Sequence, residues 1–385
     1  NLAIRKLRSW ARPKRVRTPI VHIIARSYIH YQPYGQVLVL SPWNFPFQLS
    51  LVPVLGALAA GNCVVLKTSQ RVPHTSRVIE KIISNLPKDM IVTINGDHSV
   101  SEYLLDHRFD YIFFTGSTSV GRHVMEKAAL NLTPVSLELG GKSPCVIAAD
   151  AKLDFAVKRI AWGKFYNAGQ TCVAPDYLLI DKRIKDRFLD LLTKEIRTFY
   201  GEKPEQSDDY PHVINEESVL RLASLMKAGQ IVTGGTLDLK NHYVAPTVIK
   251  DITPDDPVMK QEIFGPVLPV IDFESFEEVY GIIDRNPKPL AVYIFTRNRK
   301  LAREFLVKTK SGSAAINDTV IQFASTYLPF GGVGSSGMGR YHGKHSFETF
   351  SNVRGVMMKS NLIDFFLRYP PYNKLKEKAF KWFMR

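Results

Sequence analysis

Residues 36–67 read QVLVLSPWNFPFQLSLVPVLGALAAGNCVVLK, and this stretch indicates the fold of the first half of the chain. The apolar runs at 37–40 and 63–66 have the length of strands, and 49–60 has the length of a helix. The apolar segment 49–66 falls short of the 18 or more residues of a membrane span, because it is interrupted by Pro53, Gly56, Gly61 and Asn62. It is therefore interpreted as a buried helix that leads into a strand.

The alternation of strands and helices continues outward from this unit. We expect strands at 91–94, 111–114 and 143–148 and helices at 75–83 and 121–130. It resumes after Leu153, with helices at 153–165 and 185–200 and strands at 177–180 and 268–273, and residues 202–213 are expected to form a surface loop. Such βαβ alternation predicts two α/β lobes with parallel sheets, which bind ligands at the carboxyl ends of their strands.

Length and charge narrow the class of protein. A chain of 385 residues exceeds the roughly 250–300 residues of a single core, and 45% hydrophobic with 23% charged residues excludes a disordered or collagen-like protein. The net charge of +15 first suggests nucleic acid or an anionic membrane as partner. However, residues 1–17 contribute +7 and residues 368–385 contribute +5, so the middle carries only +3. We expect no nucleic-acid partner.

Three cysteines, Cys63, Cys145 and Cys172, form neither a disulfide framework nor a metal-spaced group, which favours a reducing, cytoplasmic location and no metal. Cys172 follows the small and polar residues NAGQT, where a turn can expose a thiol and surround it with backbone amides. A small core residue is the equal alternative for Cys172. Cys63 and Cys145 lie in apolar strand patterns and are expected to be core residues.

Glu138 and Asn44 are the other candidate catalytic residues. Glu138 lies between leucines in LELGGKS (137–143), and an apolar environment raises a carboxyl pKa toward the range of a general base. Its alternatives are a helix cap or an ion pair with Lys142, and we favour catalysis. Two prolines bracket Asn44 in SPWNFP (41–46) and fix it as an oxyanion donor must be fixed, although a helix cap is as consistent with the sequence.

Two further features point to a phosphate-bearing ligand. The stretch FTGSTSVG (114–121) links a strand to a helix, and its glycines would let the backbone approach a phosphate at the helix N-terminus. It lacks the P-loop Lys-Ser/Thr and the middle glycine of the usual dinucleotide fingerprint, so an ordinary turn is the alternative. Lys67 ends a strand where a cation can meet a ribose or phosphate, but a solvated lysine is the default.

Together these segments resemble the aldehyde dehydrogenase superfamily. The matching stretches, in order along the chain, are PWNFP (42–46), LK (66–67), FTGS (114–117), ELGGKS (138–143), GQTC (169–172), EIFGP (262–266) and PFGG (329–332). The stretches GQTCVAPDY (169–177) and YHGKHSFETF (341–350) are similar to the class 3 branch, which acts on fatty and aromatic aldehydes. The resemblance covers nearly the whole chain, which we expect to be shortened at its front.

The resemblance implies a role for each candidate residue. Cys172 would be the nucleophile, the Asn44 amide and the Cys172 backbone N–H would hold the oxyanion, and Glu138 would activate the hydrolytic water. In class 3 relatives Glu262 is a rival base, and we rank Glu138 first. NAD would be bound by Lys67 and Glu262 at ribose hydroxyls, by Phe264 at the nicotinamide, and by Gly116, Ser117 and Gly121 at the pyrophosphate.

One departure from the family bears on the cofactor. Most relatives have Lys-Pro-Ser-Glu where this chain has Lys67-Thr68-Ser69-Gln70. A carboxylate at the last position repels a 2′-phosphate, whereas the amide of Gln70 can donate a hydrogen bond to it. We therefore expect NADP to be accepted alongside NAD.

The resemblance also implies a domain organisation. A Rossmann-like NAD(P)-binding domain (36–139) would join an α/β catalytic domain (140–340), with a small bridging and oligomerisation unit formed by 15–35 and 343–360 and a basic tail at 361–385. In relatives the bridging strands extend a neighbour's sheet, which implies a homodimer. The tail can form a basic amphipathic helix, for which packing on the dimer is favoured over contact with a membrane surface.

The expected activity is the NAD(P)-dependent oxidation of a medium- or long-chain aliphatic or aromatic aldehyde to its acid, through a cysteine thiohemiacetal and an acyl-thioester. One alternative is a CoA-acylating dehydrogenase, although such relatives tend to lack a glutamate at residue 138. The other is a non-catalytic family member used as a binding or structural protein, which the retained Cys172, Asn44, Glu138 and Glu262 disfavour.

Overall fold

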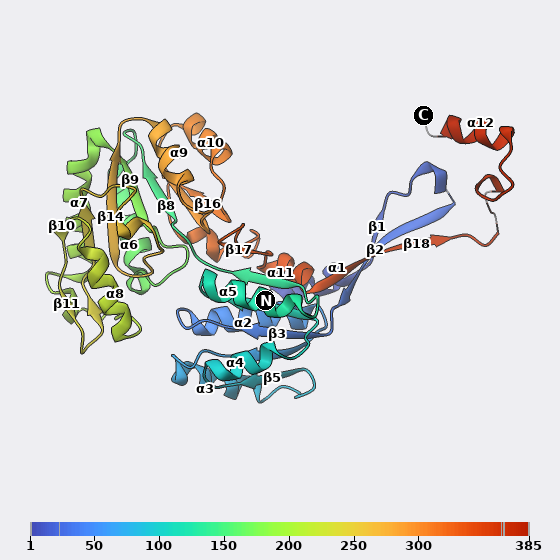
Figure 1. Ribbon diagram of the computed structural model, residues 1–385, viewed down its shortest axis with the longest axis horizontal. Coiled ribbons are helices and arrows are strands. Elements are labelled where there is room, and N and C mark those ends of the chain that lie inside the picture. Colours follow the sequence, from blue (N-terminus) through green and yellow to red (C-terminus); the bar gives the residue numbers. More distant parts are fainter. Residues whose placement is uncertain (1, 23, 363, 365, 384–385) are drawn as a thin grey trace.

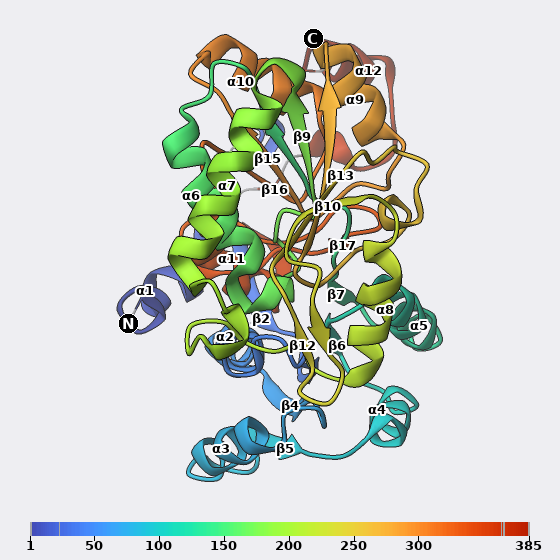
Figure 2. The same ribbon diagram turned by 90° about the vertical axis from the view of Figure 1, so that its left-hand side faces the viewer.

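The computed structural model describes residues 2–22, 24–362, 364 and 366–383. Two α/β lobes lie side by side in Figure 1, and a long ribbon of strands extends away from them toward the C-terminal helix. Figure 2 shows the lobes one above the other, with the short strand β17 (Gly337–Met338) between them. The predicted α/β, two-lobed fold class is confirmed.

The first lobe contains a six-stranded sheet in the order β17-β7-β6-β3-β4-β5, parallel except for β17. Its parallel strands are β3 (Gln36–Leu40), β4 (Cys63–Lys67), β5 (Ile91–Ile94), β6 (Tyr111–Thr115) and β7 (Val135–Glu138). The helices are α2 (Pro46–Ala59), α3 (Pro73–Ile83), α4 (His98–Leu105) and α5 (Thr118–Ala129). The chain leaves β3 toward β4 and later returns to its other side at β6, so a ligand crevice is expected at the carboxyl ends of these two strands.

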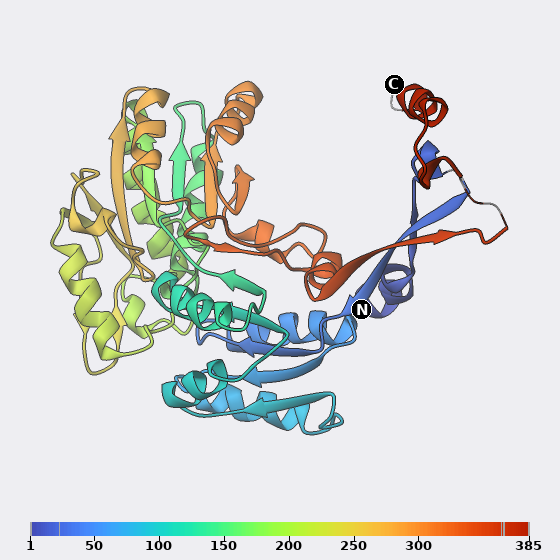
Figure 3. The ribbon, with the colours of Figure 1, turned by 45° about the vertical axis from the view of Figure 1, so that its right-hand side comes forward.

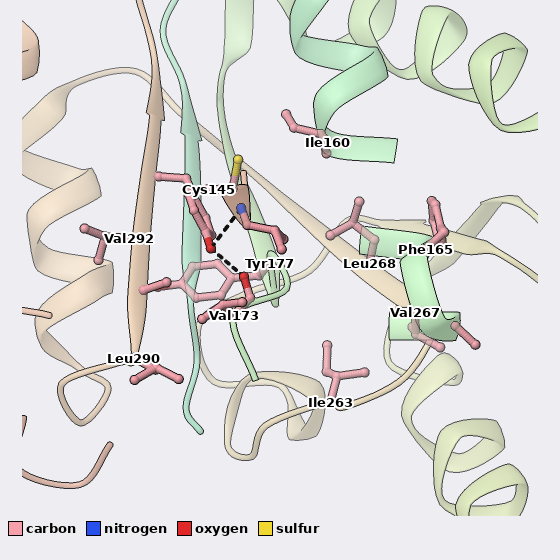
Figure 4. Packing of buried hydrophobic residues seen from close by; sticks show 14 of the residues in the cluster. Cys145, Ile160, Phe165, Val173, Tyr177, Ile263, Val267, Leu268, Leu290 and Val292 are labelled. Atoms are coloured by element: carbon pink, nitrogen blue, oxygen red, sulfur yellow. Dashed lines mark hydrogen bonds between the residues drawn. The ribbon is translucent and has the colours of Figure 1, made fainter. Parts of the chain in front are cut away.

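The second lobe has a seven-stranded sheet in the order β10-β13-β14-β9-β8-β15-β16. The strands are β8 (Pro144–Ile147), β9 (Tyr177–Asp181), β10 (Gln230–Thr233), β13 (Thr247–Lys250), β14 (Val267–Phe273), β15 (Ala291–Phe295) and β16 (Ser313–Ile316). The helices are α6 (Leu153–Phe165), α7 (Lys185–Tyr200), α8 (Glu216–Met226), α9 (Phe276–Asp284) and α10 (Arg299–Lys308). Figure 4 shows side chains of α6 packed over this sheet, where Cys145 and Tyr177 are fully buried.

A separate three-stranded ribbon carries β2 (Ala25–Pro33) in its centre, between β1 (Lys14–Val16) and β18 (Ser351–Lys359). Strands β2 and β18 pair antiparallel along their whole length, from Ser351 opposite Pro33 to Lys359 opposite Ala25. Figure 3 shows this ribbon standing clear of both lobes. Helix α1 (Leu2–Ala11) and α11 (Gly343–Thr349) lie near its base, and α12 (Lys374–Phe383) lies beyond its far end.

The structure differs from the sequence predictions at a few points. Helices α2 and α3 begin earlier than predicted because Pro46 and Pro73 occupy their first turns, where a proline is favourable. Cys63 is exposed at the first position of β4, so its assignment to the core was wrong, whereas Cys145 is buried as expected. Within the described ranges, none of the helices is both long and apolar enough to cross a membrane.

Candidate active site

A cavity of about 490 Å³ lies at the carboxyl ends of β3, β6 and β7. Its walls come from both lobes and include most of the predicted site residues: Asn44, Gly116, Ser117, Glu138, Cys172, Glu262 and Phe264. Strand-end loops of the first lobe thus face Cys172 of the second. The remaining predicted residues, Lys67, Gln70 and Gly121, lie outside the lining of this cavity.

A sharply turned loop after α6 presents Cys172 to the cavity. Asn167 and Ala168 adopt left-handed backbone conformations with φ near 50° (52° and 50°), and Gly169 follows with φ 70°. A side chain at residue 169 would not fit, because its Cβ would lie 2.3 Å from the carbonyl oxygen of Gly265. The loop therefore depends on this glycine to place the thiol.

The groups around the Cys172 sulfur shift the pKa of its thiol in opposite directions. Burial, with the carboxyl groups of Glu262 and Glu138, raises the pKa of the thiol to about 12, while the backbone N–H groups of Cys172 and Val173 lower it. Cys172 could be an accessible thiol or a small core residue. The structure supports the accessible thiol, since the side chain is only partly buried and lines the cavity.

Asn44 is tied to the Cys172 loop. Its side-chain Nδ2 donates to the carbonyl of Gln170 over 3.0 Å, and Nδ2 of Asn167 donates to the carbonyl of Asn44 over 2.9 Å. The N-cap of α2 is Phe45, so the alternative that Asn44 caps this helix is wrong. Only one N–H of the Asn44 amide is used by Gln170, and a second remains for a ligand.

Glu138 ends β7 and is 3% exposed, and neither of its carboxyl oxygens has a hydrogen-bond partner in the described part of the chain. Burial raises the pKa of this carboxyl well above its usual value, and the charge of Arg340 offsets this only in part. The alternative ion pair with Lys142 is wrong, because Nζ of Lys142 lies 2.5 Å from Asp176 and donates to the carbonyl of Val258. A buried carboxyl without partners at a cavity wall is a candidate proton acceptor.

Glu262 brings a second carboxyl group to the same cavity. It packs on Gly140 so closely that a Cβ at residue 140 would lie 2.1 Å from Oε2 of Glu262. Burial and the charge of Asp176 raise the pKa of Glu262 to about 8, against the opposing effects of the Gly141 N–H, Lys142 and Arg221. Two carboxyl groups of raised pKa therefore flank one cysteine.

The turn between β6 and α5 fits a phosphate-bearing ligand. Ser117 is the N-cap of α5 and accepts a hydrogen bond from the N–H of Val120, while the Gly116 N–H is held by the carbonyl of Glu138. Gly121 lets α5 approach the sheet, since a Cβ there would lie 2.7 Å from Leu139. Phe264 also lines the cavity and stands edge-on to Trp43, with ring centroids 5.5 Å apart.

Lys67 and Gln70 lie next to each other beyond the end of β4. Lys67 is only 5% exposed, so the solvated-lysine alternative is wrong, and its Nζ donates to the side-chain oxygen of Gln70 over 3.5 Å. Burial lowers the pKa of Lys67, and the charge of Asp97 partly offsets the shift. Gln70 lines a neighbouring cavity of about 300 Å³ with Arg77 and Asn95. The two cavities lie along the carboxyl ends of the parallel strands, and such a row of strand ends fits an extended dinucleotide.

Sequence reasoning missed Arg221, which also lines the site. Arg221 lies on α8 and its Nη2 donates to the carbonyl of Ile263 over 2.7 Å, beside Glu262. An arginine within an amphipathic helix carries no motif, and no signal in the sequence marked it. Among the described residues, groups of three or more His, Cys, Asp or Glu that could hold a metal ion are absent.

Comparisons with known proteins agree with this geometry. Residues 4–356 match the model of the aldehyde dehydrogenase family. The chain is 42% identical to aldehyde dehydrogenase family 3 member A2 of Pongo abelii, over 100% of this chain and 80% of that protein. It is 44% identical to the dimeric, NADP-preferring aldehyde dehydrogenase of Rattus norvegicus, over 96% of this chain and 83% of the relative.

Solved structures give the same result. The substrate-bound state of Staphylococcus aureus AldH superposes with a TM-score of 0.96 at 42% identity, covering 100% of this chain and 84% of that one. The NAD⁺ complex of an aldehyde dehydrogenase from Bacillus cereus gives a TM-score of 0.84 at 29% identity, covering 93% and 74%. The chain belongs to the aldehyde dehydrogenase family, in its class 3 branch, and is an NAD(P)-dependent enzyme that oxidises aldehydes.

Proposed function

We propose that Cys172 is the nucleophile, Asn44 the oxyanion donor and Glu138 the general base of this oxidation. The observation that supports the assignment is the single cavity in which a thiol, a tethered amide and an unpartnered buried carboxyl meet. The Cys172 thiolate adds to the aldehyde carbon, and the negative charge that develops on oxygen is stabilised by the free N–H of the Asn44 amide and the Cys172 backbone N–H.

The residues that would hold the cofactor lie along the row of strand ends. Lys67 and Glu262 would bind ribose hydroxyls, Gly116, Ser117 and Gly121 would form the pyrophosphate site at the N-terminus of α5, and Phe264 would pack on the nicotinamide side. The nicotinamide, when bound at these residues, would supply the hydride acceptor for the oxidation. Gln70 and Arg77 at the adjoining cavity support acceptance of NADP alongside NAD.

Hydrolysis of the acyl-thioester requires a base, which we assign to Glu138. Its ionised carboxylate would accept a proton from water as the water oxygen attacks the thioester carbon, and the thiolate of Cys172 would leave. A carboxyl of raised pKa, once ionised, is a stronger base than an exposed glutamate. Glu262 remains the rival base, ranked second because Gly140 and the Gly141 N–H hold its carboxyl.

The substrate would reach Cys172 by a route separate from the cofactor site. A second cavity of about 810 Å³, here called the aromatic channel, shares Asn44 with the first, and its aromatic lining is Phe45, Phe47, Trp162, Tyr166, Phe199 and Tyr200. Such walls suit medium- or long-chain aliphatic and aromatic aldehydes. A relative at 42% identity is named 4,4′-diaponeurosporen-aldehyde dehydrogenase of Staphylococcus aureus, which supports a large apolar substrate.

We further propose a cytoplasmic homodimer with the domain boundaries given above. Strand β18 forms one edge of the ribbon and exposes apolar side chains: Val353, Val356, Met357 and Met358. An exposed apolar edge strand favours coverage by another chain, and the rat relative is named dimeric.

Leu375 and Trp382 of α12 are also exposed, and we favour their packing on the dimer over contact with a membrane surface. Free cysteines support the cytoplasm.

The test is a panel of aldehydes, acetaldehyde, dodecanal and benzaldehyde, followed by NAD(P)H absorbance. The wild type should oxidise the larger aldehydes with the higher kcat/KM, Cys172→Ala should lose all turnover, and Cys63→Ala is the matched control at an exposed cysteine. Aldehyde oxidation that survives in Cys172→Ala would contradict the covalent route. Stimulation by coenzyme A would favour the acylating alternative.

A further inference from the structure

The inner wall of the aromatic channel is a run of stacked rings. Phe45 and Tyr166 stack with centroids 5.8 Å apart at 21°, and Tyr166 in turn stacks on Trp162 at 5.3 Å and 29°. Trp162 and Tyr166 remain 40% and 42% exposed, and both residues line the channel. Aromatic faces carry partial negative charge and attract cations as well as apolar groups.

The charge on the wall of the same channel is purely negative. Among the described residues, the charged side chains that line it are Asp208 and Asp209, in the loop after α7, and the lining contains no Lys or Arg. Neither carboxylate forms an ion pair within the described ranges of the chain. Asp209 adds to the effect of burial in raising the pKa of Tyr200, which places its carboxylate close to the channel wall. This acidity stands out in a chain of net charge +15.

We propose that the aromatic channel selects aldehydes by the charge at their far end, favouring an ammonium or quaternary ammonium group and disfavouring a carboxylate. The aldehyde group would lie at Asn44 and Cys172 while the opposite end reaches the rings and the two aspartates. Cation–π attraction and the carboxylates act in the same direction on a cation, and both oppose an anion. The proposal rests on the proposed function, because it takes the channel as the route to Cys172.

Three aldehydes of matched length test the proposal: 4-(trimethylammonio)butanal, its neutral isostere 5,5-dimethylhexanal, and 5-oxopentanoate. Longer homologues of each aldehyde are included, so that at one chain length all three reach from Cys172 to the far end of the channel. We expect kcat/KM to fall from cation to neutral to anion at the best length, with about tenfold between cation and anion, because exposed charge pairs and cation–π contacts are individually weak. The preference should shrink as ionic strength rises.

The double variant Asp208→Asn/Asp209→Asn should reduce the preference for the cation over the anion severalfold while leaving kcat/KM for the neutral isostere unchanged. Asp190→Asn, an exposed aspartate of α7 outside the channel, is the matched control and should leave the ranking as it is. Trp162→Leu should reduce the preference for the quaternary cation over its neutral isostere.

The charge preference would be overturned by equal kcat/KM for the cation and its neutral isostere at every length, or by a preference that the double variant leaves undiminished. Failure of the proposed function has a different signature, since then the neutral isostere and dodecanal would not be oxidised either. A higher rate with the anionic aldehyde would also contradict the proposal.

Discussion

The carboxyl group of Glu262 lies directly on the backbone of Gly140. A Cβ at residue 140 would be 2.1 Å from Oε2 and 2.3 Å from Oε1, so no side chain can share this position with Glu262. Gly140 follows Glu138 and Leu139 on the chain, and Glu262 comes from a loop of the other lobe. This contact therefore fixes how the two lobes present their carboxyl groups to Cys172.

Gly140→Ala should displace Glu262 from the cavity wall. Gly140 is not one of the residues with positive φ, so the added methyl group acts through the carboxyl group and not through backbone strain. We expect kcat/KM with NAD(P) to fall about a hundredfold, because small misplacements of positioning groups have such effects. Steady-state kinetics with a varied cofactor would measure it.

Gly281→Ala is the control for that substitution. Gly281 lies in α9, and nothing lies within 4 Å of a Cβ placed there. Alanine is favoured over glycine within a helix, so this variant should keep full activity and melt at the same or a higher temperature. Unchanged kinetics in Gly140→Ala would show that Glu262 can move without consequence.

Ionisation of Glu262 should make stability depend on pH. Its pKa is about 8 in the folded protein against an ordinary glutamate value of 4.5, so the folded state retains a proton that the unfolded state loses between these values. Stability is therefore lost as the pH rises through this window. Glu262→Gln should melt above the wild type by a margin that grows from pH 5 to pH 8, worth at most about 4 kcal/mol.

The measurement is the difference in melting temperature between variant and wild type across this pH range. Glu277→Gln, at an exposed carboxyl of α9, is the matched control. If the Glu262→Gln difference changes with pH no more than the Glu277→Gln difference does, the carboxyl of Glu262 is ionised in the folded protein near neutral pH, and its assigned environment is wrong.

Glu138→Gln should separate the two halves of the reaction. Hydride transfer does not need the hydrolytic base, so the first turnover should release NAD(P)H rapidly, while hydrolysis of the thioester slows by about a hundredfold to ten-thousandfold. Stopped-flow absorbance should show a burst that approaches one equivalent per active site. A steady-state rate in Glu138→Gln equal to that of the wild type would indicate that Glu262 is the base.

Much of the fold could be predicted because its signals are local. Residues 36–67 carry a strand, a helix and a strand within one stretch, and the structure places β3, α2 and β4 there. The short strand β7 was not predicted, since Val135–Glu138 mixes apolar and polar residues and pairs with β6 and β17 only through the tertiary fold. Arg221 was not predicted as a site residue for a similar reason, because its position at the site depends on how α8 packs.

The central claim is a covalent bond between Cys172 and the substrate, and trapping it tests that claim most directly. Glu138→Gln would be mixed with dodecanal and NAD(P), quenched in acid and digested, and the peptide that contains Cys172 would be weighed by mass spectrometry. The mechanism predicts a dodecanoyl adduct on Cys172, formed only when both reagents are present. Dodecanoic acid formed without any acyl group on that peptide, at any quench time, would contradict the assignment.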